Sequence, residues 1–361
     1  MSLEETIKLL QQLIRVPSLS REEKNCADFL SDYFDRKRIA LQRIHNNLLL
    51  KNRHFDPQKE NILLNSHLDT VRANENWTVD PFDPVIREGK ISGLGSNDAG
   101  ASLVSLLNVF MHFYDLQDLN YNLIFLASAE EEISGIQGVT SVLPHLEPIS
   151  FGIVGEPTGM HLAIAEKGLM VLDCKVRGIS GHAARNEGNN AIYMAIKDIE
   201  WIREHKFPDR SELLGDVKMT VTKINAGTQH NVIPDECSFV VDVRSTDVYP
   251  NEQILEIIKQ NLSGDVIARS TRLQSSSIHV DHILVKAALS LGISLFGSDT
   301  LSDQALMPFP TAKIGPGDSS RSHTADEFIL ADEIRDGIGI YIKLLDKLLK
   351  EDQKKVIPKI R

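Results

Sequence analysis

The sequence predicts an α/β protein with a mostly parallel sheet that helices cover on both faces, together with an inserted α+β domain. Short apolar runs alternate with stretches of helical periodicity in the first half of the chain. Strands that alternate with helices favour a parallel sheet. From about residue 168 the pattern changes to apolar and polar residues in alternation, which is typical of an antiparallel sheet. At 361 residues, the chain exceeds the size at which one core usually stops growing.

The first part of the predicted parallel-sheet domain is residues 1–167. It begins with an amphipathic helix, because apolar residues recur at helical spacing at Ile7, Leu10, Leu13 and Ile14. Buried strands that end in polar residues are predicted for NLLLK, NILLNSHLD and YNLIFLASAEE, and helices for ASLVSLLNVFMHFYDL and TSVLPHL. In a parallel sheet, ligands bind beyond the carboxyl ends of the strands. The polar residues after these runs are therefore candidates for a site.

The inserted domain is predicted at residues 168–276. Its strands are expected in LMVLDCKVRGIS, DVKMTVTKINAG and CSFVVDVRS, and its helices in NNAIYMAIKDIEWIREH and NEQILEIIKQNL. Residues 277–361 return to the parallel-sheet domain, with a helix around HILVKAALSLG and a Gly/Pro turn in KIGPGDSS. The tail, residues 354–361, is expected to be a solvated end.

Composition narrows the function classes. A formal net charge of −11 argues against nonspecific binding to nucleic acid or to an anionic membrane surface. The three cysteines, Cys26, Cys174 and Cys237, are widely separated, which indicates a reducing compartment and small buried side chains. The first residues lack the positive start of a signal peptide, and no apolar run approaches the roughly 20 residues that span a bilayer. We therefore expect a cytoplasmic protein.

Six side chains with the chemistry of metal ligands stand in short polar motifs, most of them after strand-like runs. They are His67, Asp98, Glu131, Glu132, Glu156 and His323. Two imidazoles and three carboxylates, with one spare Glu, suit two divalent metals that share a bridging carboxylate. Such nitrogen and oxygen ligands without thiolate favour Zn²⁺, Co²⁺ or Mn²⁺. The spare Glu could serve as a base. Asp69 follows His67 by two residues and could orient its ring.

Each of these residues also has an ordinary structural explanation. His67 could be a buried histidine whose hydrogen bonds are satisfied within the protein. Glu131 and Glu132 could begin a solvated helix, where acids interact well with the helix dipole. In the last motif, Asp326 and Glu327 could likewise be acids at the start of a helix. The glycines before Asp98 form a poor dinucleotide fingerprint. The occurrence of five such motifs in one chain favours the metal site.

The motifs in order resemble those of the metallopeptidase family of acetylornithine deacetylase, succinyl-diaminopimelate desuccinylase and carboxypeptidase G2. The motifs that carry this resemblance are HLDTV, GLGSNDAG, AEEE, GEPT, GISGH and GDSSRSHTADE, and they cover nearly the whole chain. The last is most similar to the acetylornithine or acetylcitrulline deacetylase branch. The resemblance implies that residues 1–167 and 277–361 form the catalytic domain and that the inserted domain is a dimerisation (lid) domain. It also implies that the protein is a homodimer.

The resemblance also implies a ligand set for two metal ions, with Zn²⁺ the first expectation and Co²⁺ the alternative. His67, Asp98 and Glu156 would hold one metal. Asp98, Glu132 and His323 would hold the other, with Asp98 as the bridge. The family often has a cis peptide bond after the bridging Asp. It also often has a Lys two residues later, where this chain has glycine.

Catalytic roles follow from the same resemblance. Glu131 is implied as the general base and Asp69 as the partner of the metal-binding histidine. The family usually has Asp-Glu-Glu where this chain has Glu130, Glu131 and Glu132, so a shift of one residue would exchange base and ligand. His182 is implied to reach a partner subunit's active site and to stabilise the oxyanion, and a surface loop histidine is the alternative.

Three further residues concern the substrate. Asn231 and Arg244 match family positions that contact substrate, and the fork of Arg244 could bind a carboxylate. A surface ion pair is the alternative for Arg244. Lys167 is a candidate for an anionic acyl end, although an ordinary exposed lysine is the favoured interpretation.

The implied function is the removal of an N-acyl group, acetyl or succinyl, from an ornithine- or citrulline-like amino acid in arginine biosynthesis. A water that bridges two metals would attack with the help of Glu131. The alternatives are a dipeptidase or aminoacyl-carboxypeptidase of the same family, and a catalytically silent relative that binds an amino-acid derivative. The complete ligand set weighs against the silent relative. No nucleic acid or membrane partner is expected.

Overall fold

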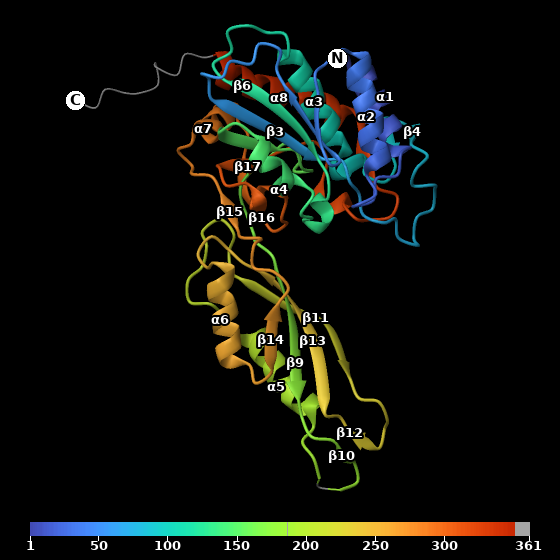
Figure 1. Ribbon diagram of the computed structural model, residues 1–361, viewed down its shortest axis with the longest axis vertical. Helices are drawn as coiled ribbons and strands as arrows, with labels where there is room; N and C mark the ends of the chain where they lie inside the picture. The colour runs from blue at the N-terminus through green and yellow to red at the C-terminus, as the bar shows by residue number, and fades with distance from the viewer. Residues whose placement is uncertain (186, 351–361) are drawn as a thin grey trace, which may run out of the picture. The chain divides into compact units, whose positions relative to one another are not determined.

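The computed structural model describes residues 1–185 and 187–350, and the tail at 354–361, expected to be a solvated end, lies outside them. The chain divides into two compact units (Figure 1). The first comprises Met1–Ile164, Ile278–Phe296 and the chain from Ser302. The second comprises Ala165–Ser277 and Gly297–Leu301.

The largest sheet is parallel at its centre. Its strands are β1 (Gln42–Ile44), β2 (Asn47–Lys51), β3 (Asn61–His67), β6 (Asn122–Ser128), β7 (Ile149–Val154), β8 (Leu162–Glu166), β15 (Ser276–Ser277), β16 (Leu295–Ser298) and β17 (Thr311–Lys313). In the part of the chain that the structure describes, the order is β1-β2-β6-β3-β7-β17-β8-β15, and β16 pairs with β8. Strands β6, β3, β7 and β17 are parallel neighbours, and the outer pairs β1–β2, β2–β6, β17–β8 and β8–β15 are antiparallel. The predicted α/β class with a parallel central sheet is confirmed.

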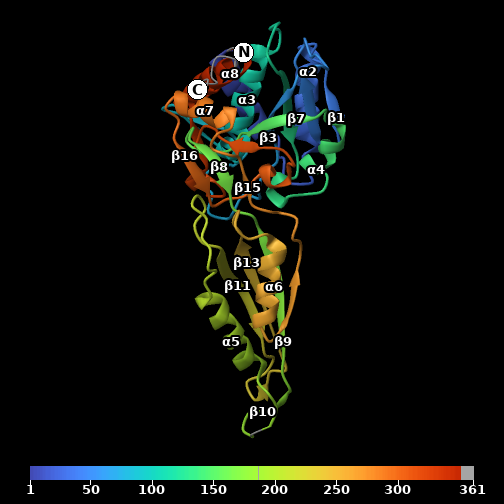
Figure 2. The ribbon, with the colours of Figure 1, turned by 90° about the vertical axis from the view of Figure 1, so that its left-hand side faces the viewer.

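Helices cover both faces of this sheet. The first unit contains α1 (Leu3–Ile14), α2 (Lys24–Arg36), α3 (Ala101–Phe113), α4 (Val139–Val142), α7 (Ile283–Ser290) and α8 (Ala331–Lys350). Because successive strand residues point to opposite faces, Ile62 and Leu64 of β3 pack in the core that holds α3 and α8. Leu63 packs on the other face with α4. Figure 2 shows α3 and α4 on opposite sides of β3.

Local sequence signals account for several helix boundaries. The first helix begins with a capping box, in which the Ser2 side chain accepts from the backbone of Glu5 and the Glu5 side chain accepts from the backbone of Ser2. The helix predicted in TSVLPHL is wrong in extent. It forms α4 and then a 3-10 turn, η3 (Leu143–His145), because Pro144 has no N–H to continue the α-helical pattern. The other short turns are η1 (Ser96–Gly100), η2 (Glu131–Ile133), η4 (Asp303–Leu306) and η5 (Ser319–Arg321).

The second unit has an antiparallel sheet packed on two helices. Its strands are β9 (Met170–Arg177), β11 (Lys218–Ala226), β13 (Glu236–Arg244) and β14 (Asp265–Ala268), and its helices are α5 (Ala191–Glu204) and α6 (Asn251–Asn261). The sheet order is β11-β13-β9-β14. Alternate residues of β9 are buried, and Leu172 and Cys174 share a core with both helices. Strands β10 (Gly181–His182) and β12 (Val232–Ile233) form a separate pair.

A small sheet of three short strands completes the fold. Strands β4 (Val85–Arg87), β5 (Lys90–Ser92) and β18 (Phe328–Leu330) form a small sheet in the order β18-β5-β4. The three cysteines are free and buried, as expected from their spacing. Over residues 1–185 and 187–350, none of the helices has the length and apolar character needed to cross a bilayer.

Candidate metal centre

The predicted ligands begin at one edge of the parallel sheet. His67 is the last residue of β3, η2 follows β6, and Glu156 follows β7. These three strands are parallel neighbours. Their carboxyl ends therefore lie at the same edge, which brings the side chains together. Asp98 joins them from η1, whose backbone is not helical at this residue.

One half of the cluster is built around His67. Its Nε2 lies 3.2 Å from Asp98 Oδ1, 3.9 Å from Glu156 Oε1 and 4.0 Å from Glu131 Oε2. The His67 side chain is 1% exposed. One imidazole nitrogen thus faces three carboxylates in a buried position.

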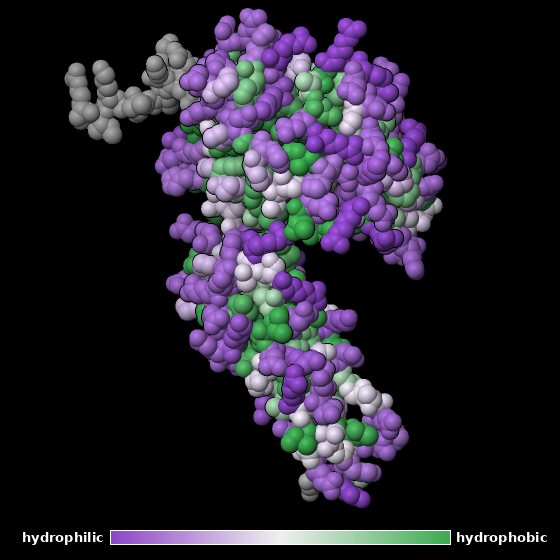
Figure 3. Space-filling model, viewed as in Figure 1, coloured by the Kyte–Doolittle hydropathy of each residue, from purple (hydrophilic) through white to green (hydrophobic). Residues whose placement is uncertain are grey.

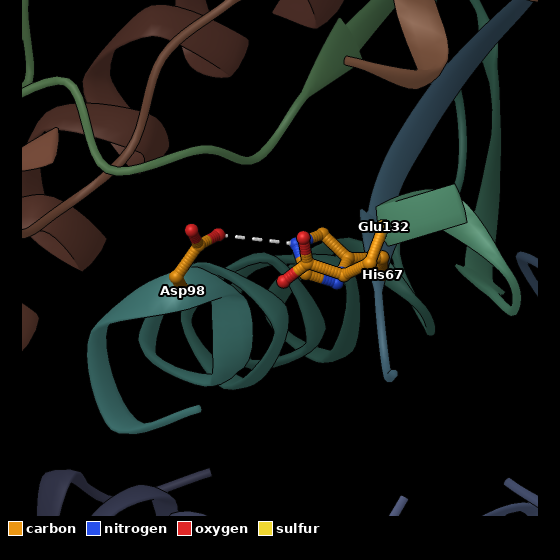
Figure 4. A group of neighbouring side chains, drawn as sticks. All are labelled: His67, Asp98 and Glu132. Carbon is orange, nitrogen blue, oxygen red and sulfur yellow. Dashed lines mark hydrogen bonds and ion pairs between the residues drawn. The ribbon is translucent and has the colours of Figure 1, made fainter. Parts of the chain in front are cut away.

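The other half is built around His323. Its Nε2 lies 3.0 Å from Glu132 Oε2 and 3.6 Å from Asp98 Oδ2. Asp98 therefore directs one carboxylate oxygen toward each histidine. Potential ligand atoms of His67, Asp98 and Glu132 all lie within 4.8 Å of one another. Figure 4 shows these three side chains together, with the interaction between His67 and Asp98 as a dashed line.

Asp69 fixes the orientation of the first histidine and the backbone of η2. His67 Nδ1 lies 2.9 Å from the Asp69 carbonyl oxygen. A carbonyl oxygen can only accept, so Nδ1 carries the proton, and in the neutral ring Nε2 is left with a lone pair for a metal. The Asp69 carboxylate accepts from the backbone N–H of Glu131 at 3.0 Å and of Glu132 at 3.2 Å, and from Ser20 Oγ at 2.7 Å. Asp69 thus connects His67, the turn η2 and Ser20 by hydrogen bonds.

The three consecutive glutamates have different surroundings. Glu130 has a left-handed backbone with φ 54°. Its backbone N–H donates to Glu23, and its Oε2 accepts from the N–H of Gln137. Glu132 contacts His323, and its Oε1 is buried without a hydrogen-bond partner among the residues that the structure describes. A buried carboxylate oxygen without a partner is costly. A bound cation would supply the missing interaction.

The electrostatics of the cluster also fit a cation. Burial raises the pKa of Glu131 well above its ordinary value, although the nearby His67 acts against this rise. Burial raises the pKa of Glu156 to about 8. The hydrogen bond with Glu132 raises the pKa of His323 to about 9. Four buried or half-buried carboxylates, together with two imidazoles, form a donor set that suits divalent metals of the Zn²⁺ class.

His182, Asn231 and Arg244 belong to the second unit, and the cluster forms without them. The His182 side chain is exposed, and its Nδ1 accepts from the N–H of Ala184. The carbonyl of Asn231 accepts from the N–H of Ala183. The Arg244 fork binds both carboxylate oxygens of Asp242, at 2.8 and 3.1 Å. This last contact is the ion pair considered as its alternative.

The favoured interpretation of Lys167 is wrong, because this residue is not an exposed lysine. Lys167 is 7% exposed, and its Nζ lies 2.9 Å from Asp299 Oδ1. Its backbone N–H donates to the carbonyl of Ser298. The chain returns to Lys167 more than one hundred residues later and covers it, which no local sequence signal indicates.

Sequence reasoning also missed residues around the ligands. Glu327 does not begin a helix, since β18 follows it and α8 starts only at Ala331. It is buried and accepts from three backbone N–H groups of the Asp98 loop. Asp303 is 2% exposed, and burial raises its pKa to about 6. Its Oδ2 accepts from Asn65 and Ser128, one residue on each of the strands β3 and β6.

The peptide bond between Asp98 and Ala99 is cis, as the resemblance implied.

An α/β unit with this donor set at the carboxyl ends of parallel strands is typical of a metal-dependent enzyme. The chain belongs to peptidase family M20/M25/M40, whose model matches residues 63–347. It is 27% identical over 274 residues to the succinyl-diaminopimelate desuccinylase of Orientia tsutsugamushi (strain Ikeda), covering 71% of each chain. It is also 27% identical over 297 residues to that of Pelagibacter ubique, covering 76% of each chain. The protein is thus a metal-dependent amide hydrolase.

Solved structures show the same fold. Aminopeptidase PepT from Bacillus cereus superposes with a TM-score of 0.76 at 18% identity, covering 96% of this chain and 99% of that chain. A dinuclear metal binding peptidase of the M20 family from Bacillus subtilis gives a TM-score of 0.70 at 15% identity, covering 96% and 98%. At these identities the similarity concerns the fold.

Proposed function

We propose that this protein is a two-metal deacylase that removes an acetyl or succinyl group from the amine of an amino acid. The observation that carries the proposal is the cluster of two imidazoles and three carboxylates, with a further buried carboxylate, Glu131, beside it. The relatives named succinyl-diaminopimelate desuccinylase support an N-acyl amino acid as the substrate class. Within this class we favour an ornithine- or citrulline-like amine of arginine biosynthesis, and the acetylornithine or acetylcitrulline deacetylase branch.

The distances are compatible with the ligand distribution that the resemblance implies, although Glu131 and Glu156 lie equally near His67 Nε2. His67, Asp98 and Glu156 would hold one cation, since both carboxylates face His67 Nε2. Asp98, Glu132 and His323 would hold the other, with Asp98 shared. Zn²⁺ is the metal we favour, and Co²⁺ is the alternative. When bound, two such ions would lower the pKa of a water and polarise the amide carbonyl.

Glu131 is the residue we propose as the general base. Its carboxylate lies near His67 but not in the direct contact that Glu132 makes with His323. The bond from its N–H to Asp69 sets its backbone. Glu131 would accept a proton from the attacking water and pass it to the nitrogen of the leaving amine. The contact of Glu132 with His323 supports Glu132 as the ligand.

The second unit is the proposed dimerisation and lid domain. Exposed apolar side chains of this unit are candidates for the dimer contact, because contiguous apolar surface marks protein–protein interfaces. Tyr193 and Ile196 on α5 are 69% and 43% exposed, and Ile224 on the edge strand β11 is 55% exposed. Figure 3 shows hydrophobic side chains on the visible face of this unit. In a homodimer, His182 would stabilise the oxyanion in the partner's site, and Asn231 and Arg244 would bind substrate.

A dipeptidase or aminoacyl-carboxypeptidase of the same family is the second candidate. Both candidates share the chemistry of amide hydrolysis and differ in the acyl group. A further proposal concerns location: the three free, buried cysteines support the reducing environment of the cytoplasm.

The test is a substrate screen with release of free amine as the readout. Acetylornithine, acetylcitrulline, succinylcitrulline, succinyl-diaminopimelate and a panel of dipeptides would be assayed with added Zn²⁺ or Co²⁺. We expect at least one N-acyl amino acid to be cleaved with a kcat/KM above that of every dipeptide. Cleavage of dipeptides alone would favour the second candidate. A metal-loaded protein without activity on any amide would contradict both.

A further inference from the structure

Two loops of the first unit meet beside the ligand cluster, and each carries one proposed ligand. The first loop, residues 95–98, ends in Asp98. The second, residues 317–327, contains His323 and ends in Glu327. The geometry points to a clamp made by Glu327 and Asn97. We propose that these two residues position Asp98 and His323 for the cation that both would bind.

Glu327 is the first part of the clamp. Its carboxylate is buried, with the residue 2% exposed. Oε1 accepts from the backbone N–H groups of Asn97 at 2.8 Å and Asp98 at 2.9 Å, and Oε2 accepts from Gly95 at 3.0 Å. Three bonds from one carboxylate fix the course of the loop immediately before and at Asp98.

Asn97 is the second part, and it joins the two loops in both directions. Its Nδ2 donates to the carbonyl of Asp318 at 3.0 Å, and its Oδ1 accepts from the N–H of Asp318 at 3.0 Å. Asn97 is fully buried. The side-chain amide of Asn97 therefore pairs with both backbone polar groups of Asp318, in the loop that carries His323.

The clamp compensates for weak support of His323 itself. The His323 side chain is 54% exposed, whereas that of Asp98 is 12% exposed. A loop loses backbone freedom when its histidine binds a metal, and a loop that is already fixed avoids that loss. The proposed role is thus to hold the ligands near their final geometry before the cation arrives.

This inference rests on the proposed two-metal site, and metal binding is therefore measured directly. Metal-free protein would be titrated with Mn²⁺ or Zn²⁺ by calorimetry, with the wild type, Glu327→Gln and Asn97→Ala compared. In either orientation, a glutamine amide places a donor against at least one of the three N–H groups. We expect the weaker of two binding events to lose about 10- to 100-fold in affinity, as is typical for partners of ligand segments. Excess metal should restore much of the kcat.

Asp198 supplies a matched control. It is a buried carboxylate of the second unit that also holds a loop by three donors, the N–H and Oγ of Ser263 and the N–H of Gly264. Asp198→Asn should lower the melting temperature but leave both metal affinities unchanged. Equal loss of metal affinity in Asp198→Asn and Glu327→Gln would overturn the proposal, as would unchanged affinities in both clamp variants. A wild type that binds no metal would instead contradict the proposed function.

Discussion

Glu131 and Glu132 are adjacent and chemically identical, yet their side chains have different surroundings. Glu132 contacts His323 and has one buried oxygen without a partner among the described residues. Glu131 approaches His67 only to 4.0 Å. Their backbones are held by the same carboxylate, that of Asp69. One turn thereby presents two carboxylates to one site in different surroundings.

Glu131→Gln should separate the roles proposed for these two residues. We expect two metals to remain bound and kcat to fall about 10²- to 10⁴-fold, because a general base is lost while the ligands stay. Metal content and steady-state kinetics would measure this. Glu130→Gln is the control, since the Glu130 carboxylate binds the backbone of Gln137, and it should stay close to wild type. Loss of a metal in Glu131→Gln, with metals retained in Glu132→Gln, would exchange the two assignments.

The sequence could predict which side chains form the cluster because they stand in recognisable motifs, most of them at strand ends. Glu327 could not be found in this way. Its partners are backbone N–H groups, which every residue type but proline offers, so its role leaves no trace in residue identity. The prediction of an exposed Lys167 was wrong for a related reason, since the burial of this side chain depends on a segment distant in sequence.

At the scale of elements, the loop of residues 317–327 approaches the loop of residues 95–98 closely at a glycine. Gly317 has φ +94°, and a Cβ at this position would lie 2.3 Å from Asn97 Oδ1. Side chains are disfavoured there by both the backbone angle and the close approach of the amide. The turn KIGPGDSS was predicted from its Gly and Pro, but the contact with Asn97 was not.

Gly317→Ala and Gly292→Ala form a matched pair. Gly292 has φ +76°, and a Cβ there would meet nothing within 4 Å. Both variants should carry a backbone cost of about 1–2 kcal/mol. Only Gly317→Ala should also displace Asn97, so we expect it to unfold at a lower urea concentration and to bind metal more weakly. Equal effects of the two substitutions on metal affinity would contradict this coupling.

Most helices and strands were predictable because periodicity reports which face is buried. The alternation in β9, β11 and β13 and the helical spacing in α1 and α5 are examples. The extent of α4 was not predicted correctly, since Pro144 ends the α-helical pattern inside an apolar stretch.

At the scale of the molecule, the cluster links stability to pH. In the metal-free protein, burial raises the pKa of Glu156 from 4.5 to about 8, and the contact with Glu132 raises that of His323 from 6.5 to about 9. Both groups bind a proton more tightly in the folded state. Their contribution is therefore complete below the unfolded pKa and is lost as pH rises through the folded pKa.

We therefore expect the melting temperature of metal-free protein to fall between about pH 6 and pH 9. Divalent metal should raise it more at about pH 8 than at pH 6, because binding replaces protons on the ligands. Scanning calorimetry with a chelator or with added metal would measure both. Glu156→Gln should flatten the dependence, and a melting temperature that rises across this range would disprove it.

Assembly gives a second prediction at this scale. If the exposed apolar residues of the second unit form a dimer interface, Tyr193→Asp together with Ile196→Asp should yield a folded monomer with much lower kcat. Light scattering and activity would be measured on the same sample. Val79, an exposed apolar residue of the first unit, provides the control in Val79→Asp. A wild-type monomer with full activity would exclude the role proposed for His182.

The separation of His67 and His323 along the chain has a consequence for biosynthesis. The inserted segment and most of the polypeptide lie between the two histidines. A nascent chain on the ribosome exposes the first imidazole long before the second exists. If the proposed site binds metal, both histidines can act as ligands only after His323 has been translated, and a product terminated before His323 would lack that ligand.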